Sequence, residues 1–365
     1  MNQGKYIFAQ LTDFLPRRVF DRIVDKYEGN KRVRSFTCWN QMLCMVFGQL
    51  TARDSMRDLI LSLEAHQSKY YHLGFGPTVS RRNLGTANEK RNCQIFEEFA
   101  YVLIAEARRS CYRNDFEIEV DSNVYALDST TIDLFLSVFW WTEFRKHKGG
   151  IKLHTLFDIK TSIPSFIQIT TAKVHDVNII DLIPYERGSF YVADKAYTDF
   201  HRLQRINANG SFFVIRVKDN LQFKRMYSKA VDKTTGVIND QIGRLLVPKS
   251  RSEYPKKLRR IKYYDADHNL ELVFLTNNMD LDATEIAFLY KKRWEVELFF
   301  KWLKQHLKIK SFWGITLNAV KIQMYCAIIA YCLVALVGNK LKVKRTIYEI
   351  LQILSISLLD KTPVN

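Results

Sequence analysis

The feature that most constrains the fold of this 365-residue chain is a change in apolar periodicity near residue 117. Before this point, apolar residues recur at helical spacing over 36–50, and a second helical pattern starts at Ser55 with Asp58 three residues later as a capping signal. A further helix is expected over 86–109. After this point, short apolar runs that are typical of strands replace the helical pattern.

The runs after residue 117 have an order that predicts a fold class. Strands are expected at 124–132, 151–157, 166–172, 189–194 and 212–217. The first three suit antiparallel pairing, whereas the run ending at Asp194 is compact and apolar, like a strand buried in a mixed sheet. Helices are expected at 176–184 and 200–207. Three antiparallel strands, a helix, a parallel strand and further helices predict an α/β fold with a ribonuclease-H-like core.

The rest of the chain completes a division into four segments. A strongly basic stretch over 218–269 has strand-like pieces at 261–264 and 270–275, one long helix is expected over 282–308, and the last helix over 346–358. We therefore expect a helical N-terminal region, the first part of the core, a basic and mostly β insertion, and the second part of the core with C-terminal helices. Their predicted ranges are 1–115, 116–217, 218–278 and 279–365.

The charge of the chain indicates a polyanionic partner. Lys and Arg number 55 against 38 Asp and Glu, which gives a formal charge of +17 at pH 7. Cations set against phosphates release condensed counterions, so such a surplus favours nucleic acid binding. A membrane surface is the alternative polyanion, but the cations are spread along the whole chain instead of forming one juxtamembrane block.

The cysteines and the apolar runs indicate the cellular compartment in which the chain is expected. The six cysteines show no Cys-x2-Cys spacing, which argues against a zinc site or a disulfide scaffold and fits a reduced cytosolic compartment. No signal peptide is evident at the start. The apolar run 324–337 is shorter than the roughly 18–20 residues that span a bilayer, so we interpret it as a buried core helix.

Two aspartates occupy unusual places in the predicted strands. Asp128 lies within an apolar strand and Asp194 ends one, where a carboxylate must be paired, solvated or bound to a cation. Asp133 lies five residues beyond Asp128 and so points to the opposite face. Ligands gather at the carboxyl ends of strands in open sheets. Each aspartate taken alone could equally be a strand-end residue that caps a loop or a helix.

A third carboxylate lies on the predicted helix over 282–308. Tyr290, Arg293, Glu297 and Lys304 have offsets of 0, 3, 7 and 14, which place them within an arc of roughly 60° on one helix face. Lys301 falls beside them. Salt bridging between Glu297 and its neighbours four residues away would explain the charges without any functional role.

These residues together resemble a known family. Tyr290-x2-Arg293-x3-Glu297-x6-Lys304 is similar to the Tyr-Arg-Glu-Lys signature of bacterial insertion-sequence transposases of the IS-four family, within the DDE class. Leu127-Asp128-Ser129-Thr130 resembles the family's first aspartate block and Val192-Ala-Asp194-Lys-Ala-Tyr197 its second. Asn318-Ala-Val320 with Gln323 is similar to the segment that follows the glutamate. One departure is Lys195, because many relatives carry glycine there.

The resemblance implies both an activity and a site. It implies a DDE transposase that holds two Mg²⁺ or Mn²⁺ ions on Asp128, Asp194 and Glu297, and hard oxygen ligands suit these cations. Two such ions can activate the attacking group and stabilise the leaving 3′-oxygen. Residues expected to contact DNA are Tyr290, Arg293, Trp294, Lys301, Lys304, Lys148 and Lys152. His147 and His154 lack metal-ligand spacing and are interpreted as surface or strand histidines.

The predicted function is cut-and-paste transposition in the bacterial cytoplasm, associated with the nucleoid. The expected partners are the inverted-repeat ends of the transposon, bound by 1–115, and target DNA, with a dimer in the DNA-bound complex. Three alternatives stay open at this point: a two-metal structure-selective nuclease of the same fold, a DNA-binding regulator without catalysis, and a membrane-associated basic protein.

Overall fold

The computed structural model divides the chain into two compact units. It describes residues 4–76, 79–111, 122–134, 139, 141, 143–145, 148–218, 220–307, 309 and 311–363. The first unit comprises 1–112, 132–151 and 299–365, and the second comprises 113–131 and 152–298.

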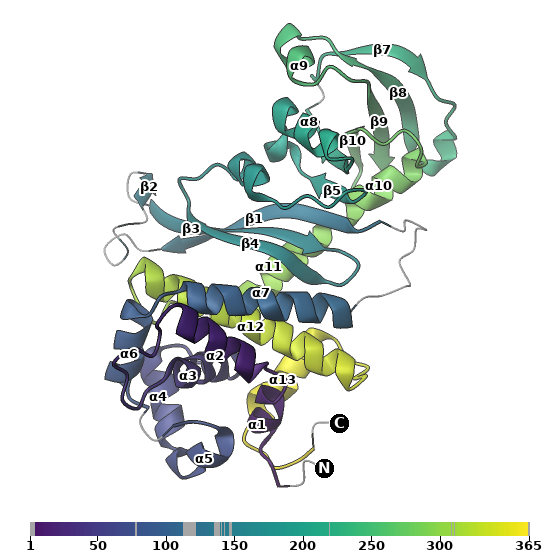
Figure 1. The fold of residues 1–365 in the computed structure, drawn as a ribbon. Coiled ribbons are helices and arrows are strands. Elements are labelled where there is room, and N and C mark those ends of the chain that lie inside the picture. The colour runs from purple at the N-terminus through teal and green to yellow at the C-terminus, as the bar shows by residue number, and fades with distance from the viewer. Residues whose placement is uncertain are drawn as a thin grey trace. The chain divides into compact units, whose positions relative to one another are not determined.

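The described part of the first unit is mainly helical (Figure 1). Its helices and the short strand β2 are α1 (Ile7–Thr12), α2 (Arg17–Lys26), α3 (Cys38–Leu50), α4 (Met56–Glu64), η1 (Gln67–Lys69), α5 (Tyr70–Leu73), α6 (Arg81–Lys90), α7 (Gln94–Ser110), β2 (Glu143–Arg145), α12 (Leu317–Lys340) and α13 (Ile347–Ser357). The predicted helix over 36–50 is confirmed, and Ser55 caps α4 by accepting a hydrogen bond from the Asp58 backbone N–H.

Helix α12 forms the centre of the first unit. It is long and apolar enough to cross a membrane, but 94% of its most apolar window is buried inside the protein. It packs against α3, α6, α7 and α13, and all thirteen residues of α3 are themselves buried. The run 324–337 is therefore a core helix, as predicted, and the reading as a membrane-associated protein loses its basis.

The predicted single helix over 86–109 is wrong, because the chain forms α6 and α7 with a break at 91–93. The Asn318 amide, from the start of α12, donates to the backbone carbonyls of Asn88 and Arg91 and accepts from the Cys93 N–H. These bonds satisfy the terminal groups that an uninterrupted helix would pair internally. The break thus depends on a contact with a distant segment.

The second unit is built on a mixed sheet (Figure 1). Its strand order is β4-β3-β1-β5-β6-β10-β9-β8-β7, and β2 of the first unit pairs with the start of β3. The elements are β1 (Val124–Leu134), β3 (Lys148–Asp158), β4 (Ile163–Thr171), η3 (Asp176–Leu182), β5 (Phe190–Ala193), η4 (Lys195–Tyr197), α8 (Phe200–Ala208), β6 (Phe212–Arg216), β7 (Phe223–Ser228), η5 (Lys233–Thr235), β8 (Val237–Leu245), α9 (Pro248–Glu253), β9 (Leu258–Asp265), β10 (Leu270–Thr276), α10 (Ala283–Lys292) and α11 (Trp294–His306), of which the last crosses the unit boundary.

All five strands predicted before residue 218 are present. Strands β1, β5 and β6 run parallel, with Val124 opposite Phe190 and Phe190 opposite Phe212. Glycines 149 and 150 lie inside β3, which therefore begins before the strand predicted over 151–157. The short helix over 176–184 is the 3-10 helix η3.

The basic segment after β6 continues the same sheet. Strand β10 pairs antiparallel with β6, and β9, β8 and β7 follow in antiparallel order. Arg259 and Asp240 form a buried pair here, with the guanidinium donating to both carboxylate oxygens at 2.9 and 2.7 Å. Arg259 also donates to the Leu281 carbonyl, just before α10. This pair ties the added strands to the helix that follows them.

The predicted single helix over 282–308 is interrupted at Arg293, between α10 and α11. The Arg293 N–H donates to the Tyr290 carbonyl and the Val296 N–H to the Arg293 carbonyl, both three residues apart. Such tightened spacing marks a local 3-10 turn. The prediction of one unbroken helix is therefore wrong at Arg293, although Arg293 and Glu297 still meet four residues apart.

We predict that Asp240→Asn lowers the free energy of unfolding by about 3–5 kcal/mol, because it leaves the buried Arg259 charge uncompensated. Chemical denaturation of the full chain measures this. The matched control is Asp267→Asn, which breaks an exposed pair with Lys291 and should leave the free energy of unfolding nearly unchanged. Equal losses for both variants would contradict the prediction.

Candidate active site

Two aspartates leave the sheet side by side because of strand register. Leu127 in β1 pairs with Ala193 in β5, and the next residues are Asp128 and Asp194. Because the two strands are parallel, Asp128 within β1 lies beside Asp194, which directly follows the carboxyl end of β5. The register thus creates a pair of acidic groups from residues 66 positions apart in sequence.

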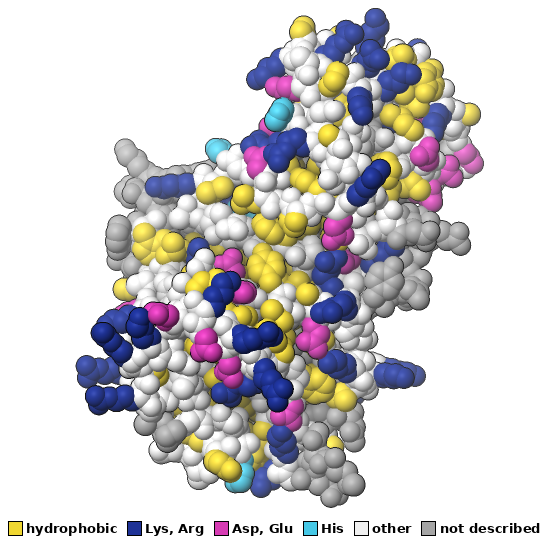
Figure 2. Space-filling view, in the orientation of Figure 1, with side chains coloured by type: hydrophobic (Ala, Val, Ile, Leu, Met, Phe, Trp, Pro, Cys, Tyr) yellow, Lys and Arg dark blue, Asp and Glu magenta, His cyan; other side chains and the backbone are white. Residues whose placement is uncertain are grey.

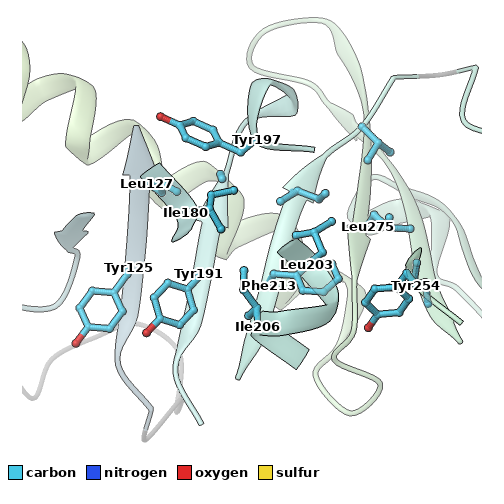
Figure 3. Packing of buried hydrophobic residues seen from close by; sticks show 14 of the residues in the cluster. Tyr125, Leu127, Ile180, Tyr191, Tyr197, Leu203, Ile206, Phe213, Tyr254 and Leu275 are labelled. Carbon is cyan, nitrogen blue, oxygen red and sulfur yellow. The ribbon is translucent and has the colours of Figure 1, made fainter. Parts of the chain in front are cut away.

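An apolar cluster fixes these strands beneath the aspartates. Tyr125 and Tyr191 stack with ring centroids 5.4 Å apart on neighbouring strands (Figure 3). Leu127 and Tyr197, also buried in this cluster, lie nearer the strand ends in the same view. Such a core leaves the strand ends little freedom, which holds the positions of Asp128 and Asp194.

Asp128 has a different partner on each carboxylate oxygen. Its Oδ1 accepts from the Ser129 backbone N–H at 2.8 Å, and its Oδ2 accepts from Arg293 at 2.9 Å. Burial raises the pKa of Asp128 to about 6, against the opposing effects of Ser129 and Arg293. The charges of Glu297 and Asp194 raise it further. The three carboxylates therefore lie close enough to influence one another.

Arg293 joins two of these carboxylates. Its guanidinium donates to Asp128 at 2.9 Å and to Glu297 Oε1 at 2.6 Å, while its side chain is only 12% exposed. Its Nε is buried with no hydrogen-bond partner. The cation thus occupies the space between two acidic groups that would otherwise repel each other.

Tyr290 holds the third carboxylate. Its hydroxyl donates to Asp194 Oδ1 at 3.1 Å, and its ring packs on Phe274 with centroids 4.8 Å apart. Burial is the main cause that raises the pKa of Tyr290 to about 12, so the hydroxyl remains a donor at neutral pH. Tyr290, Arg293 and the three carboxylates are therefore brought together in the second unit.

The remaining predicted site residues have other surroundings. Trp294 is 57% exposed. Lys152 is bound to Asp176 and to the Val174 carbonyl, both at 3.1 Å. Lys301 and Lys304 lie on α11 within the first unit, the former exposed and the latter partly exposed. The side chain of Lys148 and all of His147 lie outside the described residues.

Sequence reasoning missed the residues behind Asp128. The Ser129 hydroxyl donates to Asp176 at 2.6 Å, and His154 Nδ1 lies 3.4 Å from the same carboxylate. His154 is fully buried in β3, so it is a strand histidine and not a surface one. The available signal was Asp176 at the start of the predicted helix over 176–184, next to His175.

The contacts of Arg293 indicate whether divalent cations fit this site. Among the described residues, no group of three or more His, Cys, Asp or Glu is gathered closely enough to hold a metal. Two carboxylates nevertheless grip one cation, the Arg293 guanidinium, and a third lies near enough to affect Asp128. An all-carboxylate donor set that already binds a positive group suits Mg²⁺ or Mn²⁺.

Basic side chains are exposed over much of the described surface, not only around the candidate site. On the face drawn in Figure 2, Lys and Arg residues are spread over both units without one continuous block. In the inserted strands and the segments between them, the exposed cations include Lys224, Arg225, Lys233, Lys249, Arg251, Lys256 and Lys257. This distribution fits contacts with a long polyanion better than a single anion site.

Comparisons with known proteins agree with this chemistry. The family model described as "Transposase DDE domain" matches residues 120–333, and a second one, a domain of unknown function (DUF4372), matches 3–76. A protein of Sinorhizobium fredii named as a transposase (y4zB) is 34% identical over 263 residues, covering 71% of this chain and 72% of that protein. A protein of Geobacillus stearothermophilus, named for the transposase of insertion sequence element IS5377, is 28% identical and covers 76% of this chain and 75% of its own length.

A solved structure shares the fold. The piggyBac transposase, solved by cryo-EM as a synaptic complex with hairpin DNA, is similar with a TM-score of 0.50 and 10% sequence identity, over 96% of this chain and 79% of the other. The family match covers more than half of the chain, and the family implies dependence on a divalent metal. The chain therefore belongs to the DDE transposase family and is an insertion-sequence transposase, an enzyme that cleaves and transfers DNA strands.

Proposed function

We propose that Asp128, Asp194 and Glu297 are the catalytic carboxylates of this transposase and would hold two Mg²⁺ or Mn²⁺ ions for cut-and-paste transposition. The observation that carries the proposal is the Arg293 guanidinium bound between Asp128 and Glu297, beside the parallel strand end that supplies Asp194. Bound ions would activate the attacking hydroxyl group and stabilise the leaving 3′-oxygen.

The chain's own groups prepare the carboxylates for this task. The Ser129 N–H holds one Asp128 oxygen and the Tyr290 hydroxyl holds one Asp194 oxygen, which restricts the rotation of both side chains. Each aspartate keeps its second oxygen for a cation. Arg293 keeps the negative charges together without DNA, and a guanidinium released from them suits a phosphate oxygen.

The strand order supports a ribonuclease-H-like core. Strands β4, β3 and β1 followed by the parallel β5 and β6 reproduce the sequence-based expectation, and β7 to β10 enter between β6 and α10. The four-segment division of the chain remains a prediction. We propose double-stranded DNA as the partner, namely the transposon ends and a target, with a dimer in the synaptic complex in the bacterial cytoplasm.

We also propose that the N-terminal helices read the transposon ends. All of α3 is buried, so in the pair α3–α4 only α4 offers an outer face, with Arg57 and Leu61 exposed. The N-terminal segment cannot be tested by deletion, because α12 would lose the buried contacts that it makes with α3 and α7. Point substitutions are the suitable test.

Glu297→Gln should lower the rates of cleavage and joining at least about 100-fold, because it removes charge from the candidate site without changing its shape. Binding to transposon-end DNA should stay nearly unchanged. Cleavage and joining are measured as rates on a duplex that contains the transposon end, in Mg²⁺. Binding to the same DNA is measured by gel-shift titration. The matched control is Glu295→Gln, two residues away and paired with Lys292, which should act like the wild type. Wild-type cleavage by Glu297→Gln would exclude this ligand assignment.

Arg57→Ala should reduce the preference for end DNA over scrambled duplex by about 1–3 kcal/mol, because a base contact discriminates between sequences. Lys256→Ala, on the exposed basic surface, should weaken both DNAs alike and reduce the salt dependence of binding. Competition binding at one fixed salt concentration compares the variants. An unchanged preference in Arg57→Ala would exclude α4 as the reading helix.

The exposed Trp294 ring is available for stacking on a nucleotide turned out of the duplex, a contact worth about 1–3 kcal/mol. Trp294→Ala should leave the rate of the first nick near that of the wild type. It should slow a later step in which the nicked strand attacks the opposite strand and forms a hairpin, because that step would use the stacked nucleotide. A time course that resolves nicked, hairpin and double-cut products tests this. Uniform slowing of every step, or no hairpin in the wild type, would contradict the assignment.

A further inference from the structure

Asp176 is an acidic group just behind the candidate site that the proposed chemistry does not use. It is the first residue of η3, immediately after the turn that follows β4. Its Oδ1 accepts from the Ser129 hydroxyl at 2.6 Å and from Lys152 Nζ at 3.1 Å. One carboxylate oxygen therefore connects η3 to strands β1 and β3.

The Ser129 contact leads directly to Asp128. The backbone N–H of Ser129 donates to Asp128 Oδ1, while its hydroxyl is held by Asp176. Both groups belong to one residue, so fixing the hydroxyl also limits the movement of the N–H that orients Asp128. With Oδ1 held from this side, Asp128 Oδ2 is the oxygen that meets the Arg293 cation.

The cation paired with Asp176 is Lys152, which comes from β3 and is not one of the proposed metal ligands. Lys152 lies on the same face of β3 as His154, two residues on, and its side chain is only 17% exposed. Burial lowers the pKa of His154 to about 4, so this histidine is neutral at neutral pH. Lys152 thus places a positive charge beside Asp176, and a carboxylate is a stronger acceptor for the Ser129 hydroxyl than the neutral amide oxygen of an asparagine would be.

The space around the chain of contacts is filled. The Tyr197 side chain is buried, and its pKa is raised by burial and then by the charges of Asp128 and Asp176. The Tyr197 hydroxyl thus lies near both carboxylates, and it is buried without a hydrogen-bond partner of its own. A lost Asp176–Ser129 contact would therefore not be replaced easily by solvent.

We propose that Asp176 is a positioning residue, which acts through the Ser129 hydroxyl to orient the Asp128 carboxylate toward the divalent cation. This inference rests on the proposed role of Asp128 as a metal ligand. Residues that orient a ligand in this way typically change metal affinity by 10–100-fold when removed. A merely structural ion pair between Asp176 and Lys152 would change stability and leave cation affinity intact.

The test is Mn²⁺ binding to the full-length protein without DNA, measured by isothermal titration calorimetry. Asp176→Asn and Ser129→Ala should each weaken binding by about 10–100-fold. The double variant should be no weaker than the weaker single variant, because both changes break one pathway. In strand cleavage, the Mg²⁺ concentration at half-maximal rate should rise similarly, while the rate at saturating Mg²⁺ should recover.

Two controls match the changes made. Asp181→Asn removes a carboxylate from the same 3-10 helix, where it pairs with Arg202 at 2.7 Å. Ser165→Ala removes a hydroxyl that donates to the Leu156 carbonyl at 3.0 Å. Both should bind Mn²⁺ like the wild type, even where denaturation shows lower stability.

The outcomes separate this inference from the proposed function. Wild-type Mn²⁺ affinity in folded Ser129→Ala or Asp176→Asn, with affinity lost in Glu297→Gln, would overturn only the role of Asp176. Additive losses in the double variant would also overturn it. Should Asp176→Asn not fold, Ser129→Ala alone decides, since it removes only one hydroxyl. Wild-type affinity in Asp128→Asn and Glu297→Gln would instead refute the metal site itself.

Discussion

The parallel pairing of β1 with β5 is the constraint on which the rest of the site depends. Its register brings Asp128 and Asp194 to one strand end, where their charges oppose each other and burial raises the pKa of Asp128. Three groups stabilise this unfavourable arrangement. The Ser129 N–H and the Tyr290 hydroxyl donate hydrogen bonds to the aspartates, and Arg293 supplies a positive charge. A site built this way stores electrostatic energy that a divalent ion can release.

Arg293 links helix geometry to this electrostatic arrangement. It lies at the interruption between α10 and α11, and it contacts one carboxylate from the sheet and one from α11. The turn at Arg293 and the placement of Glu297 are therefore one feature.

Much of the strand framework could be predicted from sequence, because β1, β3, β4, β5 and β6 are apolar runs with clear boundaries. The three candidate carboxylates were expected from the resemblance, with Asp128 within a strand, Asp194 at the end of one and Glu297 on a helix. Strands β7 and β8 could not be predicted from the sequence. Strand β7 is largely exposed, so its residues do not alternate between apolar and polar. The breaks at 91–93 and at Arg293 depend on Asn318 and Asp128, which are distant in sequence. Tertiary partners of this kind leave no local signal.

The burial of α12 against α3 and α7 has a consequence for biosynthesis. The apolar faces of α3 and α7 have no permanent cover until the ribosome has passed residue 317 and released most of α12. At about 5–20 residues per second, the nascent chain waits on the order of tens of seconds in this condition. During synthesis the N-terminal helices are therefore natural clients of chaperones that shield apolar surface, and the first unit completes its folding only after the strands of the second have emerged.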